Sequence, residues 1–383
     1  MSLPEGLGAS LRSIREGLAV VQDRLDPLSL RVRSCDGGVL YEPHRDYLVD
    51  PTWAVVGRTP DGRISADTRV RIDYRYGLSR LDTVLVDASG NVALRQGDSR
   101  LPRPRPPELL AGERALANVW IPGRQQQLTA DCLFPILEDR CPPLPADRLQ
   151  CIGSRLPRTL AKLRAGEPLR IMAWGDSVTA GGWVPLECRW HQRVAAALRA
   201  AVPGAKIDLV TSAWGGKQSG EFLADPRNAE HPYPGALEGT LPDLVVSLFV
   251  NDAKSLTGLA ALDRQYGRYR DDFGRMGAEW LIVTPHYTCP EWMGFVRQRD
   301  IDGDPRPYVV ALRQFAEAHG IAIADASRHW GRLWRRGIPY TIYLSNGVNH
   351  PDAQGMEPIA DAVLEILLGS GSRPARRESA RPR

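Results

Sequence analysis

The spacing of apolar and polar residues changes twice along the chain, and each pattern predicts a different kind of structure. Near the start, five apolar residues recur at the spacing of one helical face, namely Leu11, Ile14, Leu18, Val21 and Leu25. This spacing predicts a short amphipathic helix over residues 11–25. We expect such a helix to pack against the rest of the protein or to pair with a second copy.

Between residues 30 and 122, short runs of β-branched and aromatic residues are separated by turn residues such as Asp61-Gly62. The runs cover residues 53–56, 69–76, 83–86 and 115–121. Strands at this spacing predict an all-β sandwich or barrel. The stretch 101–110 (LPRPRPPELL) interrupts this pattern with prolines, so we predict an extended edge or loop there.

From residue 169 onward, apolar runs alternate with helical patterns. Strands are predicted at Leu169–Trp174, Lys206–Thr211, Leu244–Val250, Trp280–Thr284 and Ile321–Asp325. Helices are predicted at Leu186–Ala201, Leu259–Met276, Arg306–His319 and Pro351–Leu368. Five strands with intervening helices imply an α/β fold, in which a five-stranded parallel sheet is covered on both faces.

A chain of 383 residues is too long for one typical core, so we expect at least two domains. The patterns place a helical segment at 1–29, a smaller all-β domain at 30–124, a connector at 125–163, an α/β domain at 164–368 and a disordered basic tail at 369–383. Within the connector, two short helical patterns at 147–152 and 158–163 are separated by Pro157.

Composition excludes several classes of partner. Hydrophobic residues make up 43% of the chain and charged residues 25%, which is typical of a globular protein. The net charge of +4 is small and gathers in the tail, so the sequence does not favour a nucleic-acid partner. No apolar run approaches the ~20 residues of a membrane-spanning helix. No secretory signal is visible at the start, so the cytoplasm is the default expectation.

The cysteines and histidines do not form a metal-binding pattern. Six cysteines occur without a C-x-x-C pair or a His-Cys cluster at ligand spacing, so we predict no metal site. Free thiols are favoured in a chain of this size. The alternative is a disulfide within the group formed by Cys132, Cys141 and Cys151.

Four polar motifs stand in one order inside the predicted α/β domain. They are Gly175-Asp176-Ser177, Ser212–Ser219, Asn251-Asp252 and Asn349-His350-Pro351. The first three follow predicted strands directly, and the carboxyl ends of parallel strands meet at one edge of a sheet. We therefore expect residues that are far apart in the sequence to surround one reacting group.

These motifs supply the parts that acyl transfer through serine requires: a nucleophile, a base and donors for the developing oxyanion. Ser177 can be the nucleophile and His350 the base. The backbone N–H groups of Ser177 and Gly216 and the side-chain amide of Asn251 can hold the oxyanion. Glycine lets the backbone approach a substrate, and an amide donates hydrogen bonds without titrating. This chemistry needs no cofactor.

Together the four motifs resemble those of the SGNH (GDSL-type) hydrolases over residues 164–368. The family's signature residues would be Ser177, Gly216, Asn251 and His350. The resemblance implies a flavodoxin-like three-layer sandwich, in agreement with the five predicted strands. It also implies a serine esterase, a lipase or a carbohydrate O-deacetylase, whose partner is an ester substrate that a carbohydrate can carry.

The front part of the chain loosely resembles accessory β domains attached to hydrolases. Such a domain would position a polymeric or surface-bound substrate. The proline-rich and connector segments favour two separate cores, so we expect a fragment that begins near Asp147 to fold and to act on a small ester. The sequence does not indicate an oligomeric state.

Two departures from the family pattern affect the site. An aspartate usually stands three residues before the histidine, and this chain has Gly347 there. We therefore predict a Ser177–His350 dyad, oriented by Asn346 or by a backbone carbonyl. Phe249 replaces a usual glycine and would narrow the pocket floor. The missing acid keeps a second function open, a binding or structural protein that carries a degenerate hydrolase domain.

Other polar and aromatic residues near the motifs have simpler roles. We expect Asp176 to stabilise its turn, Asp252 to be a structural capping residue and His286 to be a loop histidine. His191 and His329 fall on or near helices and are expected to pack or to face solvent. Four tryptophans flank the site as core or pocket wall: Trp174, Trp183, Trp190 and Trp214.

Overall fold

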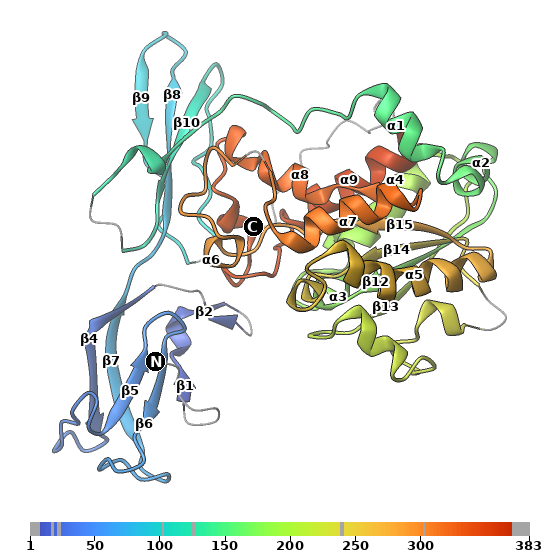
Figure 1. Cartoon of the computed structure of the whole chain (residues 1–383). Helices are drawn as coiled ribbons and strands as arrows, with labels where there is room; N and C mark the ends of the chain where they lie inside the picture. The colour runs from blue at the N-terminus through green and yellow to red at the C-terminus, as the bar shows by residue number, and fades with distance from the viewer. Residues whose placement is uncertain are drawn as a thin grey trace.

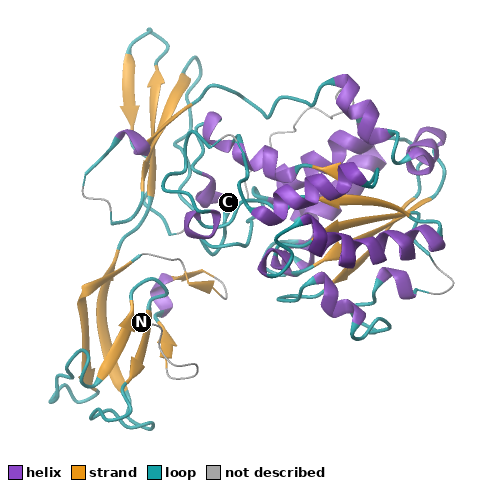
Figure 2. Cartoon of the chain, in the orientation of Figure 1, coloured by secondary structure: helices purple, strands orange, loops and turns teal. Residues whose placement is uncertain are grey.

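A computed structural model of the protein describes residues 8–16, 19–20, 24–101, 103–124, 127–237, 241–301 and 303–369. Small antiparallel sheets make up the first part of the chain, and a parallel sheet with helices on both faces makes up the second (Figures 1 and 2). The predicted basic tail lies outside the described residues from residue 370 on.

The amphipathic helix predicted near the start is wrong. The described residues there form one 3-10 turn, Arg12–Ile14, between the short strands β1 (Gly8–Ser10), β2 (Arg15–Glu16) and β3 (Ala19–Val20). Strand pairing overrides the helical spacing, because β1 pairs with β6 (Val55–Arg58) and its neighbour Leu11 is buried. The β-rich part therefore begins at residue 8, not at residue 30.

Two small sheets enclose the first hydrophobic core. One has the order β1-β6-β5, and the other pairs β4 with β7. The remaining strands are β4 (Leu25–Ser34), β5 (Tyr47–Asp50) and β7 (Val70–Tyr76). Inward-facing side chains from both sheets, including Leu30, Tyr47 and Val56, form one buried cluster, as the predicted sandwich requires.

A four-stranded antiparallel sheet has the order β11-β10-β8-β9. Its strands are β8 (Arg80–Val86), β9 (Val92–Arg95), β10 (Arg114–Ile121) and β11 (Leu133–Pro135). Because β11 pairs with β10, the β-rich part extends beyond the predicted boundary at residue 124. The described residues 103–110 of the proline-rich stretch form an extended loop, as predicted.

The second half contains the predicted five-stranded parallel sheet. Its strands are β12 (Leu169–Gly175), β13 (Ile207–Ala213), β14 (Leu244–Leu248), β15 (Glu279–Val283) and β16 (Ala322–Ala324). Their spatial order is β13-β12-β14-β15-β16, which is the 2-1-3-4-5 order of flavodoxin-like folds. The strand order reverses between β12 and β14, and such a switch point is where open α/β sheets place their ligands.

Helices cover both faces of this sheet. The helices of this half are α1 (Ala146–Gly153), α2 (Pro157–Ala165), α3 (Ser177–Ala180), α4 (Trp190–Ala201), α5 (Leu259–Met276), α6 (Pro290–Met293), α7 (Pro307–Ala318), α8 (Ala326–Gly331) and α9 (Met356–Leu368). Alternate side chains of β12 face opposite ways. Ile171 and Ala173 pack in the cluster that includes α4 and α9, whereas Met172 and Trp174 pack in the cluster that includes α5 and α7.

The two halves of the chain share one hydrophobic cluster. Leu81, Trp120 and Phe134 of the β-rich half pack with Trp334 and Ile342 of the α/β half. In the same region, Asn118 Nδ2 donates a hydrogen bond of 2.8 Å to the Gly337 carbonyl oxygen. Asn118 and Thr83, its partner in the pairing of β10 with β8, are both buried. The β-rich half is therefore part of the packed body of the protein.

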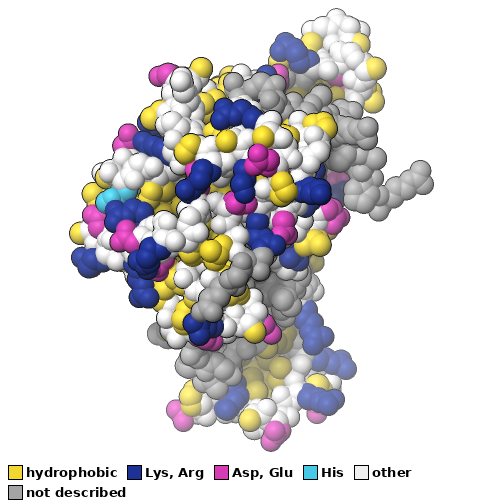
Figure 3. All heavy atoms as spheres, turned by 90° about the vertical axis from the view of Figure 1, so that its right-hand side faces the viewer, with side chains coloured by type: hydrophobic (Ala, Val, Ile, Leu, Met, Phe, Trp, Pro, Cys, Tyr) yellow, Lys and Arg dark blue, Asp and Glu magenta, His cyan; other side chains and the backbone are white. Residues whose placement is uncertain are grey.

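The surface charges, the helix lengths and the cysteines can be compared with the expectations from composition. Lysine and arginine are interspersed with acidic residues on the face of the α/β domain shown in Figure 3. None of the helices in the described part of the chain is both long and apolar enough to cross a membrane. All six cysteines are free thiols, as favoured from the sequence, so the disulfide considered among Cys132, Cys141 and Cys151 is not formed.

Candidate active site

Three of the four predicted motifs lie at the same level of the sheet. Gly175, the last residue of β12, stands in register with Ala213 of β13 and Leu248 of β14. Ser177 and Asn251 therefore leave neighbouring strands at the switch point, only two or three residues beyond this level. The parallel register brings the predicted nucleophile and the predicted oxyanion donors to one edge.

Asp176 builds the turn that presents Ser177. Its carboxylate is fully buried and accepts hydrogen bonds from the backbone N–H groups of Val178 (3.0 Å), Val250 (2.7 Å) and Asn251 (2.9 Å). Burial raises the pKa of Asp176 to about 6, although these hydrogen bonds oppose the rise. Asp176 thus stabilises its turn, as predicted, and joins the serine segment to the asparagine segment.

The structure brings the predicted nucleophile and base together. Ser177 Oγ lies 3.2 Å from His350 Nε2, and both side chains are half-buried. Burial lowers the pKa of His350 to about 4, so its imidazole is neutral near pH 7. A neutral imidazole with Nε2 facing a hydroxyl can accept the hydroxyl proton.

The backbone before His350 folds into a tight hairpin. Ser345 N donates to the His350 carbonyl oxygen at 2.7 Å, and Asp352 N donates to the Tyr343 carbonyl oxygen at 2.7 Å. His286, which is fully buried, supports this hairpin through a hydrogen bond of 2.9 Å from its Nε2 to the Asn349 carbonyl oxygen. Burial lowers the pKa of His286 to about 3, so it serves as a neutral donor beneath the turn.

Asn346 holds the backbone of this hairpin instead of the imidazole ring. Its Oδ1 accepts from the N–H groups of Val348 (3.0 Å), Asn349 (3.0 Å) and His350 (3.1 Å). Its Nδ2 donates to Asn349 Oδ1 at 3.0 Å. The side chain is therefore occupied by the turn, and the predicted orienting role becomes one of positioning the His350 main chain.

Within the described part of the chain, no carboxylate contacts the His350 ring. Gly347 has a φ of +70°, a left-handed conformation that disfavours the aspartate usual in the family. The next carboxylate along the chain, Asp352, points elsewhere. Its Oδ1 accepts from Gly355 N at 2.7 Å, and its Oδ2 faces Arg105 at 3.0 Å.

The predicted oxyanion donors Gly216 and Asn251 lie on the segments that follow β13 and β14. Gly216 has a φ of +79°, and its N–H bonds to no other group among the described residues. A Cβ added at the preceding residue, Gly215, would lie 3.9 Å from the Ser177 Cβ, so this loop passes beside the serine. Asn251 Nδ2 donates to the Lys217 carbonyl oxygen at 3.3 Å, which leaves its second N–H for a substrate.

Two sequence expectations about neighbouring side chains are refined by the structure. Phe249 does not form a pocket floor, because it is buried in the core and packs edge-on against Trp174 at a centroid distance of 4.8 Å. Asp252 is structural: it accepts from the Ser219 N–H at 2.7 Å and from the Tyr266 hydroxyl at 2.8 Å. Burial raises the pKa of Asp252.

The sequence placed Trp183 beside the site as core or pocket wall, but it did not predict a contact with the base. Its indole stacks on the His350 imidazole, with ring centroids 3.9 Å apart and an interplanar angle of 9°. Trp183 follows Gly181-Gly182 in the loop after α3, and a tryptophan beside a glycine turn carries no sequence signal for such a contact. The histidines expected on helices, His191 and His329, are buried packing residues.

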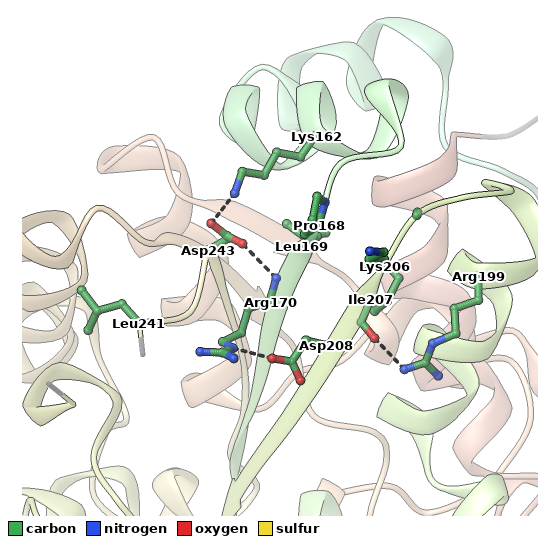
Figure 4. Close-up of a pocket in the computed structure, with 11 residues that line it drawn as sticks. Lys162, Pro168, Leu169, Arg170, Arg199, Lys206, Ile207, Asp208, Leu241 and Asp243 are labelled. Atoms are coloured by element: carbon green, nitrogen blue, oxygen red, sulfur yellow. Dashed lines mark hydrogen bonds and ion pairs between the residues drawn. The ribbon is translucent and has the colours of Figure 1, made fainter. Parts of the chain in front are cut away.

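A hollow of about 550 Å³ lies at the opposite edge of the sheet, where β12 and β13 begin (Figure 4). Two of its basic side chains pair with acidic ones: Lys162 with Asp243 at 2.8 Å, and Arg170 with Asp208 at 2.5 Å. Arg199 donates to the Ile207 carbonyl oxygen at 2.7 Å. Among the described residues, no group of three or more His, Cys, Asp or Glu side chains is placed to hold a metal ion.

Comparison with known proteins identifies the class. Residues 173–357 match the model of the GDSL-like lipase/acylhydrolase family. Residues 173–357 of the α/β half therefore form a domain that matches this family, which confirms the resemblance seen in the sequence. The matched range contains Ser177, Gly216, Asn251 and His350. A comparison with curated proteins finds no match.

Several solved structures are similar to the chain at low sequence identity. One is a two-domain esterase active on acetylated mannans (17% identity, TM-score 0.43), which aligns with 60% of this chain. The chain covers 57% of that esterase. The acetylxylan esterase Axe2 from Geobacillus stearothermophilus is 17% identical, with 54% of this chain and 97% of that chain covered and a TM-score of 0.41. A lipolytic G-D-S-L family protein from Veillonella parvula is 16% identical, with 51% and 97% covered and a TM-score of 0.38.

Proposed function

We propose that the protein is a serine esterase that cleaves carboxylic esters through a Ser177–His350 dyad. The observation that carries the proposal is the 3.2 Å separation of Ser177 Oγ and His350 Nε2 at the switch point of the sheet. The match of this domain to a lipase and acylhydrolase family supports ester hydrolysis in general. The serine mechanism and the substrate are the parts that we propose.

In the first half of the reaction, Ser177 Oγ attacks the ester carbonyl carbon while its proton passes to His350 Nε2. The carbonyl oxygen becomes an oxyanion, which the N–H groups of Ser177, Gly216 and Asn251 would hold. The tetrahedral intermediate then collapses, and the bond from the carbonyl carbon to the alcohol oxygen breaks. His350 returns the proton to the leaving alcohol, and an acyl-serine remains.

In the second half, water replaces the alcohol. His350 takes one proton from the water as its oxygen attacks the acyl carbon, and the same oxyanion donors act again. Collapse breaks the bond to Ser177 Oγ, returns the proton to the serine and releases the acid. Each step of the cycle thus uses the two side chains of the dyad, the oxyanion donors or water.

The pKa of the base sets the expected pH profile. His350 acts as base only when it is neutral, and burial lowers its pKa to about 4. The rate should therefore fall as the pH drops through about 4 and stay level from pH 5 to 8. An acidic limb near 6.5, the ordinary value for histidine, would contradict the buried environment seen here.

We propose a short-chain ester as the substrate class, including an acetyl ester carried by a carbohydrate. A panel of p-nitrophenyl esters of increasing chain length, run beside acetylated xylan and mannan oligosaccharides, would identify the acyl and alcohol groups. Release of acetate from the oligosaccharides supports a deacetylase, and activity confined to aryl esters contradicts that part of the proposal.

The decisive experiment replaces the nucleophile. Ser177→Ala should lower kcat on p-nitrophenyl acetate by several orders of magnitude, as loss of such a residue does in serine hydrolases. A serine-directed phosphonate should label Ser177 alone in the native protein. Ser89→Ala, in an exposed turn of the β-rich half, is the matched control and should leave the rate unchanged.

A second function is favoured by one specific observation, the position of Gly347 where the family has an aspartate. If His350 is not a working base without an acid on its ring, the domain would be a binding or structural module. Native protein that neither turns over esters nor reacts with the phosphonate would support this alternative. Near-normal turnover in Ser177→Ala would contradict the serine mechanism.

A further inference from the structure

The stack of Trp183 on His350 is the closest ring pair among the described residues. The two rings lie nearly parallel, and Nε2 at the edge of the imidazole still reaches Ser177 Oγ. An indole that covers one face of the proposed base restricts how that base can turn. When the imidazole becomes protonated, its positive charge lies against the face of this indole.

The indole is fixed to the same segment that carries the base. Trp183 Nε1 donates a hydrogen bond of 2.7 Å to the carbonyl oxygen of Pro351, the residue after His350. Its neighbour Val184 is buried in the core cluster beside α4 and α9. Trp183 is thus anchored at both the backbone and the indole nitrogen, so the stack is held without any contribution from the substrate.

Groups that could otherwise stabilise a protonated His350 are engaged elsewhere or neutral. Asn346 is occupied by backbone N–H groups, and Asp352 pairs with Arg105. His286 lies near enough to interact electrostatically with His350, and its own low pKa keeps it neutral. Asp176, behind the serine, is occupied by three backbone N–H groups. The face of Trp183, in contrast, lies directly against the ring.

We propose that Trp183 is a positioning residue that replaces the missing carboxylate: it fixes the plane of the His350 ring and stabilises the imidazolium formed during catalysis. This inference rests on the proposed serine mechanism. It differs from a role as pocket wall, because it requires the π face of the side chain and not only its bulk.

The physical basis is the attraction between a cation and the face of an aromatic ring. This attraction acts within about 6 Å of the ring centroid and is strongest for tryptophan. His350 is neutral before the reaction and charged in the transition state, so the stack favours the transition state over the bound substrate. The result is a gain in kcat at nearly constant KM, roughly 2- to 30-fold from the usual strength of such contacts.

The test compares two replacements that differ in their π face. Trp183→Phe keeps an aromatic face, and Trp183→Leu keeps an apolar cover of similar reach. With p-nitrophenyl acetate we expect kcat to decrease in the order Trp, Phe, Leu, with the Leu variant about tenfold below the native protein. KM should change less than twofold. Trp53→Leu, a tryptophan in the β-rich half, is the control for the general loss of an indole.

A second measurement separates positioning from simple packing. The pKa of His350, followed by NMR in the free protein, should be lower in the Leu variant than in the Phe variant, because the imidazolium loses its π partner while the ring stays covered. Equal kcat values and equal pKa values for Phe and Leu would overturn the inference, as would a change confined to KM. Loss of the fold in both variants would assign Trp183 to structure and overturn it as well.

The failure of this inference can be told apart from a failure of the proposed function. If Ser177→Ala abolishes turnover while Trp183→Leu matches the native rate, the esterase stands and the role of Trp183 does not. If Ser177→Ala retains turnover, the serine mechanism itself fails.

Discussion

The proline-rich stretch of the β-rich half places two arginines against the segment that carries the proposed base. Arg105 Nη2 lies 3.0 Å and Arg103 Nη1 3.4 Å from Oδ2 of Asp352, two residues after His350. The Asp352 carboxylate is fully buried, and about a third of each arginine side chain is exposed. We predict that replacing both arginines with methionine destabilises the protein and slows the reaction.

The magnitude follows from the burial of the carboxylate. Removal of the partner of a buried ion pair costs about 3–5 kcal/mol, because an uncompensated charge stays buried. The exposed parts of the arginines let water take their place, so the lower half of this range applies to the double variant. Arg105→Met alone should cost about 1.5–3 kcal/mol, the usual contribution of a hydrogen bond to a charged group.

Urea unfolding followed by fluorescence measures the change in the free energy of unfolding, and p-nitrophenyl acetate measures kcat. Adding Asp352→Asn to the double variant removes the buried charge and should restore part of the lost stability. Arg100→Met removes an exposed ion pair with Asp98 just before this stretch and should cost at most about 1 kcal/mol. A double variant with native stability and native kcat would refute the reasoning.

Three further predictions address the oxyanion site, the hairpin and the domain boundary. Asn251→Ala should lower kcat by about 10²–10³ with little change in KM, as removal of one oxyanion donor does, and a change in KM alone would contradict the assignment. Asn346→Ala leaves three backbone N–H groups without their acceptor and should cost about 1–3 kcal/mol in urea unfolding, whereas Asn346→Asp keeps the acceptor oxygen and should stay near native stability. A fragment that begins near Asp147 should be insoluble or unstable, because it exposes Trp334 and Ile342 of the shared cluster; a soluble fragment with full activity would contradict this.

The α/β half could be predicted from the sequence because its signals are local. Strands that are buried on both faces read as continuous apolar runs, and the five predicted runs became β12 to β16. The chemistry follows the strands, so Ser177 and Asn251 could be placed at one edge from the order of elements alone. His350 follows no predicted strand, so it could be assigned only from its motif.

The β-rich half was harder because its structure depends on pairing between distant segments. Five apolar residues at helical spacing suggested a helix near the start, yet Leu25 opens β4 and pairs with Tyr76. Strand β11, which lies beyond the boundary predicted at residue 124, was missed for the same reason, since it is too short to be recognised without its partner β10. Short strands carry little periodicity of their own.

The sequence also favoured a catalytic half that folds by itself, and the structure changes this expectation. Arg105 and Asp352 are 247 residues apart in the chain, and Asn118 and Gly337 are 219 apart. Pattern analysis treats such residues independently, so it cannot detect that one half covers part of the other. The proline-rich stretch was correctly predicted as an extended loop, but its role as a bridge to the hairpin of the base was not visible.

The low pKa of His350 affects the two proton transfers in opposite directions. A base with a pKa of about 4 removes the Ser177 proton less readily than an ordinary histidine would. Its conjugate acid is correspondingly stronger, so the same imidazolium donates its proton more readily to the departing alcohol. An aspartate on the ring would strengthen the base and weaken the acid. The proposed stack on Trp183 acts in the same direction as an aspartate but more weakly, so it strengthens the base slightly and leaves the imidazolium a stronger acid than an aspartate would.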